Sequence, residues 1–186
     1  MKWNKHSAFE GSHAFMGASK YHWINYDDAR LVESYKTYKA AKQGTLDHEF
    51  AALCIERKQR LPKTKSTLNM YVNDAIGFGM DPEVLLYYSE NCFGTADAIS
   101  YSDNRLQIHD LKTGKIPAHI EQLIVYAALF CLEYQIAPGE LTSIELRIYQ
   151  NNDILICQPE ADDILPVMDK IQRFDKIIKK IQKAEE

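Results

Sequence analysis

Two aspartates and a lysine lie close together in this chain and are of the types that bind a metal ion and act on a phosphate. They fall within Asn91–Lys115, where two runs of alternating apolar and polar residues flank a turn-prone Ser-Asp-Asn at 102–104. This pattern is typical of a β-hairpin. Alternate side chains of a strand share a face, so Asp97 can lie opposite Asp110 and Lys112. Two carboxylates on a largely apolar strand face are costly to bury unless a cation binds them.

The pattern favours a metal-dependent hydrolase. Mg²⁺ prefers hard oxygen ligands and keeps several waters, so two carboxylates suffice to hold it. Once held, it would polarise a phosphodiester and lower the pKa of a water. Lys112 would orient that water or neutralise the charge that develops on the phosphoryl group. The alternative is a surface hairpin with ordinary Asp–Lys ion pairs, which is the commoner meaning of Asp-x-Lys alone.

Four further residues are candidates for the same site. Gln122 and Tyr126 are four residues apart on a predicted helix and share one face, where they would position the lysine or face a phosphate; the alternative is a polar surface stripe. His48 can bind a metal or contact phosphate, although a lone helical histidine is more often a surface residue. Gly44 allows close approach of backbone or nucleic acid, or is a loop glycine.

The order of predicted elements indicates one α/β domain over residues 1–186. A helical part covers 1–80, with a break at Gln43-Gly44 and with the following helix over 46–61. The catalytic hairpin and a helix cover 83–136, and a second hairpin and a closing helix cover 142–184. The remaining predicted segments are helices at 19–26, 27–42, 66–78, 118–135 and 160–184, a β-rich stretch at 83–90, and strands at 142–150 and 153–158.

Composition and charge further narrow the kinds of protein that this chain can be. The chain has 22 Lys and Arg against 26 Asp and Glu, a net charge of −4, which argues against uniform coating of nucleic acid but not against a local basic groove. No apolar run reaches the ~18–20 residues that span a bilayer, and the N-terminus lacks the apolar region of a secretory signal. The basic residues collect in three groups, where they would track phosphates or serve solubility: Lys36, Lys39 and Lys42; Arg57, Lys58, Arg60, Lys63 and Lys65; and Lys170, Arg173, Lys176, Lys179, Lys180 and Lys183.

Four cysteines, all without CxxC spacing, predict reduced thiols of a cytosolic protein. Two of them, Cys54 and Cys131, fall within predicted helices and are expected in the core. The other two are Cys92 and Cys157.

Four short motifs follow one another along the chain. They are Gly44-x-x-x-His48, Gly94-x-x-Asp97, Asp110-x-Lys112 and Gln122-x-x-x-Tyr126. In order and spacing this set resembles the PD-(D/E)XK nuclease superfamily, and within it the RecB-like branch that includes phage exonucleases and CRISPR-associated adaptation nucleases. The resemblance runs from Gly44 to Tyr126, nearly half of the chain.

The resemblance implies a restriction-endonuclease-like core, with a mixed central sheet of about five strands flanked by helices. It implies that Asp97 and Asp110 bind Mg²⁺ or Mn²⁺, with the Leu111 carbonyl and His48 as further ligands. Lys112 would be the catalytic lysine, and Gln122 and Tyr126 would complete the site. The cysteines lack the quartet spacing of relatives that carry an iron–sulfur cluster, so no cluster is expected.

The resemblance also implies the activity, a metal-dependent deoxyribonuclease and foremost an exonuclease of phage or mobile-element DNA recombination. The alternatives are a structure-specific or restriction-like endonuclease and a non-catalytic DNA-binding module of the same fold. The expected partner is double- or single-stranded DNA in the cytoplasm of a bacterial or phage-infected cell, with no membrane partner. Polarity, strand preference, RNA tolerance, oligomeric state and the need for an annealing protein or helicase stay open.

Overall fold

The computed structural model describes residues 7–9 and 13–185, which fall into two compact units, Met1–Gln43 and Gly44–Glu186. The first unit contains the 3-10 helices η1 (Ser7–Phe9) and η2 (Ala18–Asn25) and the beginning of α1 (Asp28–Glu56). Its aromatic side chains pack together, with the Phe15 ring 5.2 Å from that of Tyr35 and 5.3 Å from that of Tyr38. The second unit contains all the candidate site residues.

Helix α1 corrects the prediction of two helices separated at Gln43-Gly44. The helix is continuous through both residues and ends at Glu56, not near residue 61. A glycine inside a helix costs about 1 kcal/mol relative to alanine, which is why the sequence favoured a break. The missing side chain is used in a contact instead, because a Cβ on Gly44 would lie 2.5 Å from Thr113 Oγ1.

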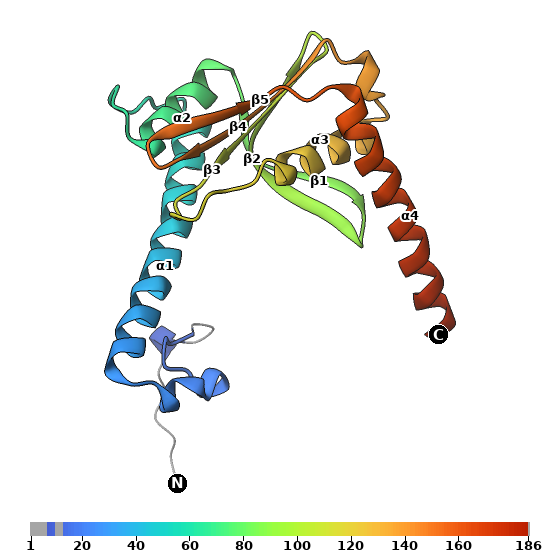
Figure 1. Ribbon diagram of the computed structural model, residues 1–186. Helices are drawn as coiled ribbons and strands as arrows, with labels where there is room; N and C mark the ends of the chain where they lie inside the picture. Colours follow the sequence, from blue (N-terminus) through green and yellow to red (C-terminus); the bar gives the residue numbers. More distant parts are fainter. Residues whose placement is uncertain (1–6, 10–12, 186) are drawn as a thin grey trace. The chain divides into compact units, whose positions relative to one another are not determined.

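The second unit is built on a five-stranded mixed sheet with strand order β1-β2-β3-β4-β5, which confirms the predicted fold class (Figure 1). Its strands are β1 (Asp81–Ser89), β2 (Cys92–Ser102), β3 (Arg105–Leu111), β4 (Ser143–Gln150) and β5 (Asp153–Cys157). Neighbours are antiparallel except β3 and β4, which are parallel.

The two predicted hairpins form because their turns carry residues that tolerate positive φ. Asp103 and Asn104 link β2 to β3 with φ of 51° and 57°, and Asn151 and Asn152 link β4 to β5 with φ of 52° and 60°. Two consecutive residues of this kind match the twist of antiparallel strands. The parallel step from β3 to β4 needs a longer crossover, which runs through α3 (Glu121–Tyr134) and the 3-10 helix η3 (Pro138–Glu140).

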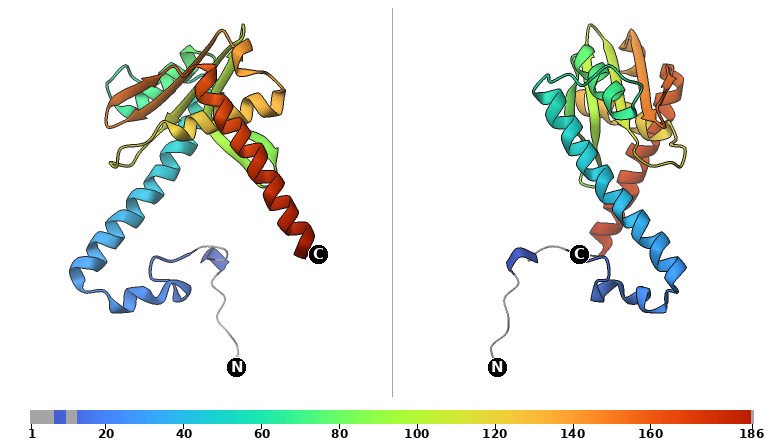
Figure 2. Two further views of the ribbon diagram at one scale, coloured as in Figure 1. Left: turned by 45° about the vertical axis from the view of Figure 1, so that its right-hand side comes forward. Right: turned by 90° about the vertical axis from the view of Figure 1, so that its left-hand side faces the viewer.

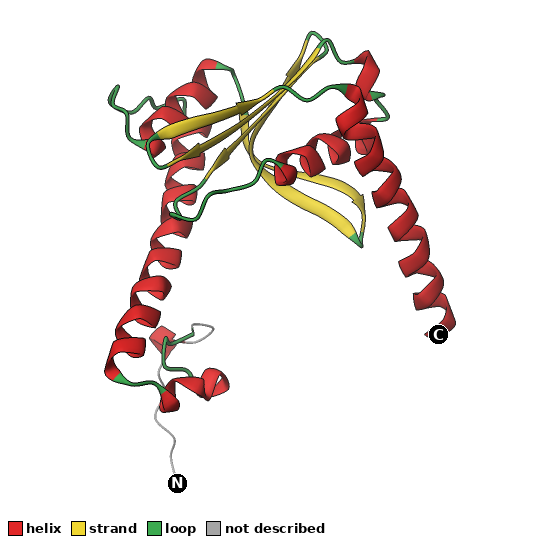
Figure 3. Cartoon of the chain, viewed as in Figure 1, coloured by secondary structure: helices red, strands yellow, loops and turns green. Residues whose placement is uncertain are grey.

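Helices lie against both faces of the sheet (Figures 2 and 3), and two separate apolar clusters join them to it. One layer contains α3 and the first half of α4 (Ala161–Glu185), packed on Leu106, Ile108 and Leu146. The other contains the end of α1 and helix α2 (Thr67–Gly77), packed on Leu111 and Tyr149. The cysteines are free, with Cys54 and Cys131 buried as predicted. None of the described helices is both long enough and apolar enough to cross a membrane.

Candidate metal centre

The hairpin brings Asp97 and Asp110 to neighbouring positions on β2 and β3. Ala98 pairs with His109 in the antiparallel register. The adjacent residues, Asp97 and Asp110, therefore lie opposite each other with their side chains on one face of the sheet. The backbone N–H of Leu111, the residue after Asp110, donates a hydrogen bond to Asp97 Oδ2 at 2.8 Å. The Asp97 carboxylate is therefore fixed by the backbone of the strand that carries Asp110.

Helix α1 and strand β1 each add a ligand-type side chain beside Asp97. His48 Nδ1 lies 3.5 Å from Asp97 Oδ2. Glu83 is bracketed in the β1–β2 register by Pro82, opposite Ala98, and Val84, opposite Ala96, which places it across from Asp97. One ligand atom from each of His48, Glu83 and Asp97 lies within 4.8 Å of the others, and Asp110 is not a member of this group.

Glu83 is the functional candidate that the sequence did not reveal. It stands first in the predicted β-rich stretch, and only the strand register shows that it faces Asp97. Its backbone has φ of 52° within a strand, a region that residues other than glycine seldom adopt and that costs of order 1 kcal/mol or more. Strained conformations of this kind concentrate at functional sites, and here the strained residue is the one that completes the group.

Lys112 lies at the centre of a chain of polar contacts that joins β3 to α3. Its Nζ donates to Asp110 Oδ1 at 3.0 Å and to Gln122 Oε1 at 2.9 Å. Gln122 Nε2 in turn donates to the Tyr126 hydroxyl at 3.2 Å. The structure thus brings together the lysine, one aspartate and the Gln/Tyr pair.

The two motif glycines hold this arrangement through close packing. A Cβ on Gly94 would lie 2.9 Å from Cε1 of the Tyr126 ring, so glycine lets Tyr126 lie directly against β2. Gly44 does the same for Thr113, the residue after Lys112. Both glycines therefore set the distance between a helix and the hairpin, and neither is a loop glycine.

The electrostatics of the centre are unbalanced toward negative charge. Burial, and then the nearby Asp97, raises the pKa of Asp110, although Lys112 opposes the shift. Burial, and then Asp97, also raises the pKa of Glu83. The hydrogen bond with Asp97 raises the pKa of His48. Three carboxylates at close range without enough counter-charge favour a bound cation.

The donor set fits a divalent cation. Carboxylate oxygens suit Mg²⁺ and Mn²⁺, and an imidazole nitrogen suits several divalent metals. Ligands at about 2.0–2.2 Å from one ion lie at most about 4.4 Å apart, so the three atoms, which lie within 4.8 Å of one another, would draw closer together around a bound ion. Asp110 Oδ2 is buried and accepts no hydrogen bond from the described residues, although Lys112 Nζ lies 3.0 Å away. Lys112 thus offsets the charge of this carboxylate, while Oδ2 keeps lone pairs that a cation can use.

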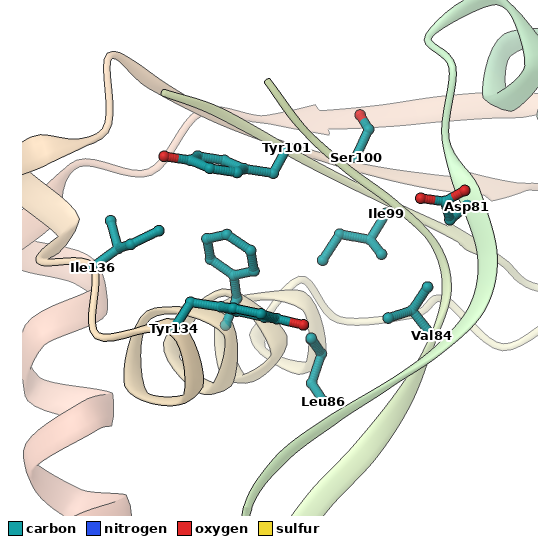
Figure 4. A pocket seen from close by; sticks show the side chains of 9 residues that line it. Asp81, Val84, Leu86, Ile99, Ser100, Tyr101, Tyr134 and Ile136 are labelled. Atoms are coloured by element: carbon teal, nitrogen blue, oxygen red, sulfur yellow. The ribbon is translucent and has the colours of Figure 1, made fainter. Parts of the chain in front are cut away.

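An apolar hollow of about 260 Å³ lies between β1, β2 and the end of α3. Val84 follows Glu83 in β1, and Ile99 lies two residues beyond Asp97 in β2. Figure 4 shows the Tyr101 and Tyr134 rings on opposite sides of this hollow. Both rings are substantially exposed, at 41% and 53%, and both pack on the Phe130 ring.

Fold and site together define an α/β protein with a mixed sheet and a His–Glu–Asp group that could hold a metal, next to a lysine-held aspartate. Residues 84–183 match the model of one protein family, "Protein of unknown function (DUF2800)", and the chain belongs to that family. The matched span includes Asp97, Asp110 and Lys112 and leaves out His48 and Glu83. No curated protein and no solved structure matches the chain.

Proposed function

We propose that this protein is a metal-dependent deoxyribonuclease that uses Mg²⁺ or Mn²⁺. The observation that carries the proposal is the position of Lys112, which holds a buried aspartate at 3.0 Å and is itself held by Gln122 at 2.9 Å. A lysine fixed between these groups beside three carboxylates is suited to a phosphate reaction, because its charge and its free N–H can meet a phosphoryl oxygen. The resemblance to RecB-like nucleases, carried by the same residues, supports this assignment.

His48, Glu83, Asp97 and Asp110, with the Leu111 carbonyl, would hold the metal. A bound divalent cation supplies Lewis-acid polarisation of the phosphodiester and makes an attacking water more acidic. An ammonium group has three N–H donors, and Lys112 uses two of them on Asp110 and Gln122. The third would orient the water or neutralise charge that develops on the phosphoryl oxygens.

Gln122 and Tyr126 position Lys112 and do not react. Gln122 accepts from the lysine and donates to the tyrosine hydroxyl, so its amide orientation is fixed at both ends. Tyr126 is fixed against Gly94. The exposed rings of Tyr101 and Tyr134 would offer stacking surfaces for unpaired bases.

The test uses end-labelled linear DNA and a closed circle, each with Mg²⁺ or Mn²⁺. We expect degradation of the linear DNA alone, with Lys112→Ala inactive and still able to bind DNA. Lys20→Ala, a change at an exposed lysine outside the three basic groups, is the matched control and should leave the rate unchanged. Cutting of the circle would assign the endonuclease in place of the exonuclease.

Metal binding is measured separately by thermal denaturation with increasing Mn²⁺. A ligand that binds only the folded state raises the melting temperature once its concentration exceeds its Kd. Absence of cleavage of both DNA forms, together with absence of Mn²⁺-dependent stabilisation, would overturn the proposal in favour of a non-catalytic module. DNA loss that Lys112→Ala leaves unchanged would point to a contaminant.

A further inference from the structure

The C-terminal half of α4 carries a row of large apolar side chains that the described part of its own compact unit leaves exposed. In the first half of the helix, Ile164 is fully buried, and Val167 and Ile171 pack on the core. Figure 1 shows the helix continuing past the sheet. There the apolar spacing is maintained although the side chains are 39–53% exposed. We call these residues the α4 stripe: Phe174, Ile177, Ile178 and Ile181.

A groove of about 270 Å³ lies at the start of this stripe. Three elements form it, namely α4, α3 and the beginning of β2, so it is a recessed site and not a flat face. Its volume falls just below the roughly 300–1,000 Å³ of small-ligand sites and suits one or two apolar side chains. The apolar residues that line this α4 groove are Cys92, Val125, Val167, Ile171, Phe174 and Ile178.

Polar contacts around Asp175 hold the groove open in one shape. The Ser89 hydroxyl donates to Asp175 Oδ1 at 2.7 Å and Asn91 Nδ2 donates to the same atom at 3.0 Å. Lys179 Nζ lies 2.8 Å from Asp175 Oδ2. The β1–β2 turn is thereby fastened to α4, which preforms the groove and lowers the ordering cost of binding.

The basic side chains around the α4 stripe favour a partner with acidic side chains. Residues 170–184 contain six basic side chains and one acidic one, Asp175, in a chain whose net charge is −4. Lys179 pairs with that acid, and the other five have no ion pair with a described residue. These five are Lys170, Arg173, Lys176, Lys180 and Lys183. An apolar stripe and groove flanked by unpaired cations are complementary to a segment that is both apolar and acidic.

We propose that the α4 groove and the α4 stripe dock an acidic, amphipathic peptide segment of a partner protein. Its apolar side chains enter the groove and cover the stripe, while its carboxylates face the lysines of α4. A second copy of the chain fits less well, because it would bring two basic helices together. DNA would meet the lysines but leave the stripe uncovered, and a lipid surface would not enter a recessed groove. The inference is independent of nuclease activity.

The experiment selects binders from a displayed library of random peptides of roughly twelve residues, using the full chain as bait. Enriched peptides are then synthesised with a fluorescent label, and their affinity is measured by anisotropy. We expect Asp and Glu combined with Leu, Ile or Phe at helical spacing. Affinity should fall about tenfold or more in Ile181→Asp and in the double variant Lys176→Glu with Lys180→Glu. It should also weaken when salt rises from about 50 to 300 mM.

Two control variants match these changes outside the α4 groove and the α4 stripe. Leu155→Asp replaces an apolar side chain of nearly equal exposure, 52% against 53% for Ile181. The double variant Lys63→Glu with Lys65→Glu reverses two exposed charges. Both variants should bind the peptide as the unchanged protein does. Enrichment of neutral or basic peptides, or equal binding by Ile181→Asp, would overturn the proposal. So would self-association, or binding to phosphatidylglycerol vesicles, that Ile181→Asp abolishes.

Discussion

Successive residues of β3 belong to two buried polar clusters that use similar side chains in opposite ways. Asp110 faces the candidate metal centre, with Lys112 at 3.0 Å. His109 faces the layer of α2, where its Nδ1 lies 3.4 Å from the Tyr149 hydroxyl. That hydroxyl donates to Asp74 Oδ2 at 2.8 Å. Arg147 completes this second cluster, which we call the His109 cluster: His109, Tyr149, Asp74 and Arg147.

The two clusters differ in charge balance. Arg147 lies between two acids, with Nη1 3.3 Å from Asp74 Oδ2 and Nη2 2.8 Å from Glu145 Oε1. Its guanidinium also lies 4.6 Å from the centre of the Phe78 ring. In the metal centre, by contrast, Lys112 pairs with Asp110, and His48 lies against Asp97. Glu83 has no ion pair with a described residue. Buried charges paired with opposite charges are typical of a structural cluster, whereas neighbouring carboxylates with less counter-charge are typical ligands of a divalent cation.

Each cluster also has one buried atom without a hydrogen bond, and the two atoms differ in cost. Tyr149 donates its one proton to Asp74, so His109 must donate from Nδ1, which leaves Nε2 as a neutral acceptor. An unpaired neutral nitrogen is a modest penalty. The atom in the metal centre is Asp110 Oδ2, which makes no directed hydrogen bond but lies 3.0 Å from the Lys112 ammonium. The ion pair offsets its cost, and the oxygen keeps lone pairs that a cation can use.

The largest expected effect is that of Asp110→Asn. Loss of a metal ligand should lower the cleavage rate by about 10³-fold or more. Metal-free stability should hold or rise, because the change removes one of three neighbouring negative charges. Rates on labelled linear DNA and melting temperatures without metal check both points. Retained cleavage, or a marked loss of metal-free stability, would place Asp110 with the structural residues.

Glu83→Gln should act on the metal itself. The change keeps the size of the side chain but removes the charge, so we expect Mn²⁺ affinity to fall about 10- to 100-fold. Titration calorimetry measures this without any activity assay. Glu90→Gln, at an exposed acid in the β1–β2 turn, is the matched control and should leave affinity unchanged. Equal affinities for the two variants would remove Glu83 from the centre.

The hairpin and the positions of its polar side chains were predictable because they follow from short-range rules. Strand alternation placed Asp97 and Asp110 on one face, and the turn at 102–104 set the register that makes them neighbours. The helix after the hairpin carries Gln122 and Tyr126 one turn apart, which led to the expectation that they would act together with Lys112. Each of these steps needs only the geometry of one element or one turn.

The parts that were not predictable depend on contacts between distant segments. Gly44 looked like a helix break because its role is to admit Thr113, nearly seventy positions later. Glu83 faces Asp97 from a backbone conformation with φ of 52°. No local sequence pattern predicts this conformation for a glutamate. The charge balance of the His109 cluster likewise depends on an ion pair between distant segments, Asp74 on α2 and Arg147 on β4. Tertiary contacts override local preference at all three positions.

The His109 cluster should lose stability as pH falls. Burial, and then the charge of Arg147, lowers the pKa of His109 from 6.5 to about 3. The unfolded chain binds a proton below about pH 6.5 while the folded chain does not, so the contribution is complete above that pH and declines toward pH 3. At about 1.4 kcal/mol per pH unit, the free energy of unfolding should be about 2 kcal/mol lower at pH 5 than at pH 7. Urea denaturation at both values tests this, and in His109→Gln the difference should shrink by that amount.

The smallest expected effect is that of Asp74→Asn, which tests whether the two clusters are independent. The amide keeps an oxygen that can accept from Tyr149 but loses the ion pair with Arg147, whose Nη1 lies 3.3 Å from Asp74 Oδ2. Partly exposed pairs contribute about 1 kcal/mol or less, and Glu145 remains to balance Arg147. We therefore expect a loss of about 1 kcal/mol in urea denaturation, with unchanged Mn²⁺ affinity. If Mn²⁺ affinity fell as far as in Glu83→Gln, β3 would be transmitting strain between its faces, and the division into a structural and a metal-binding cluster would be wrong.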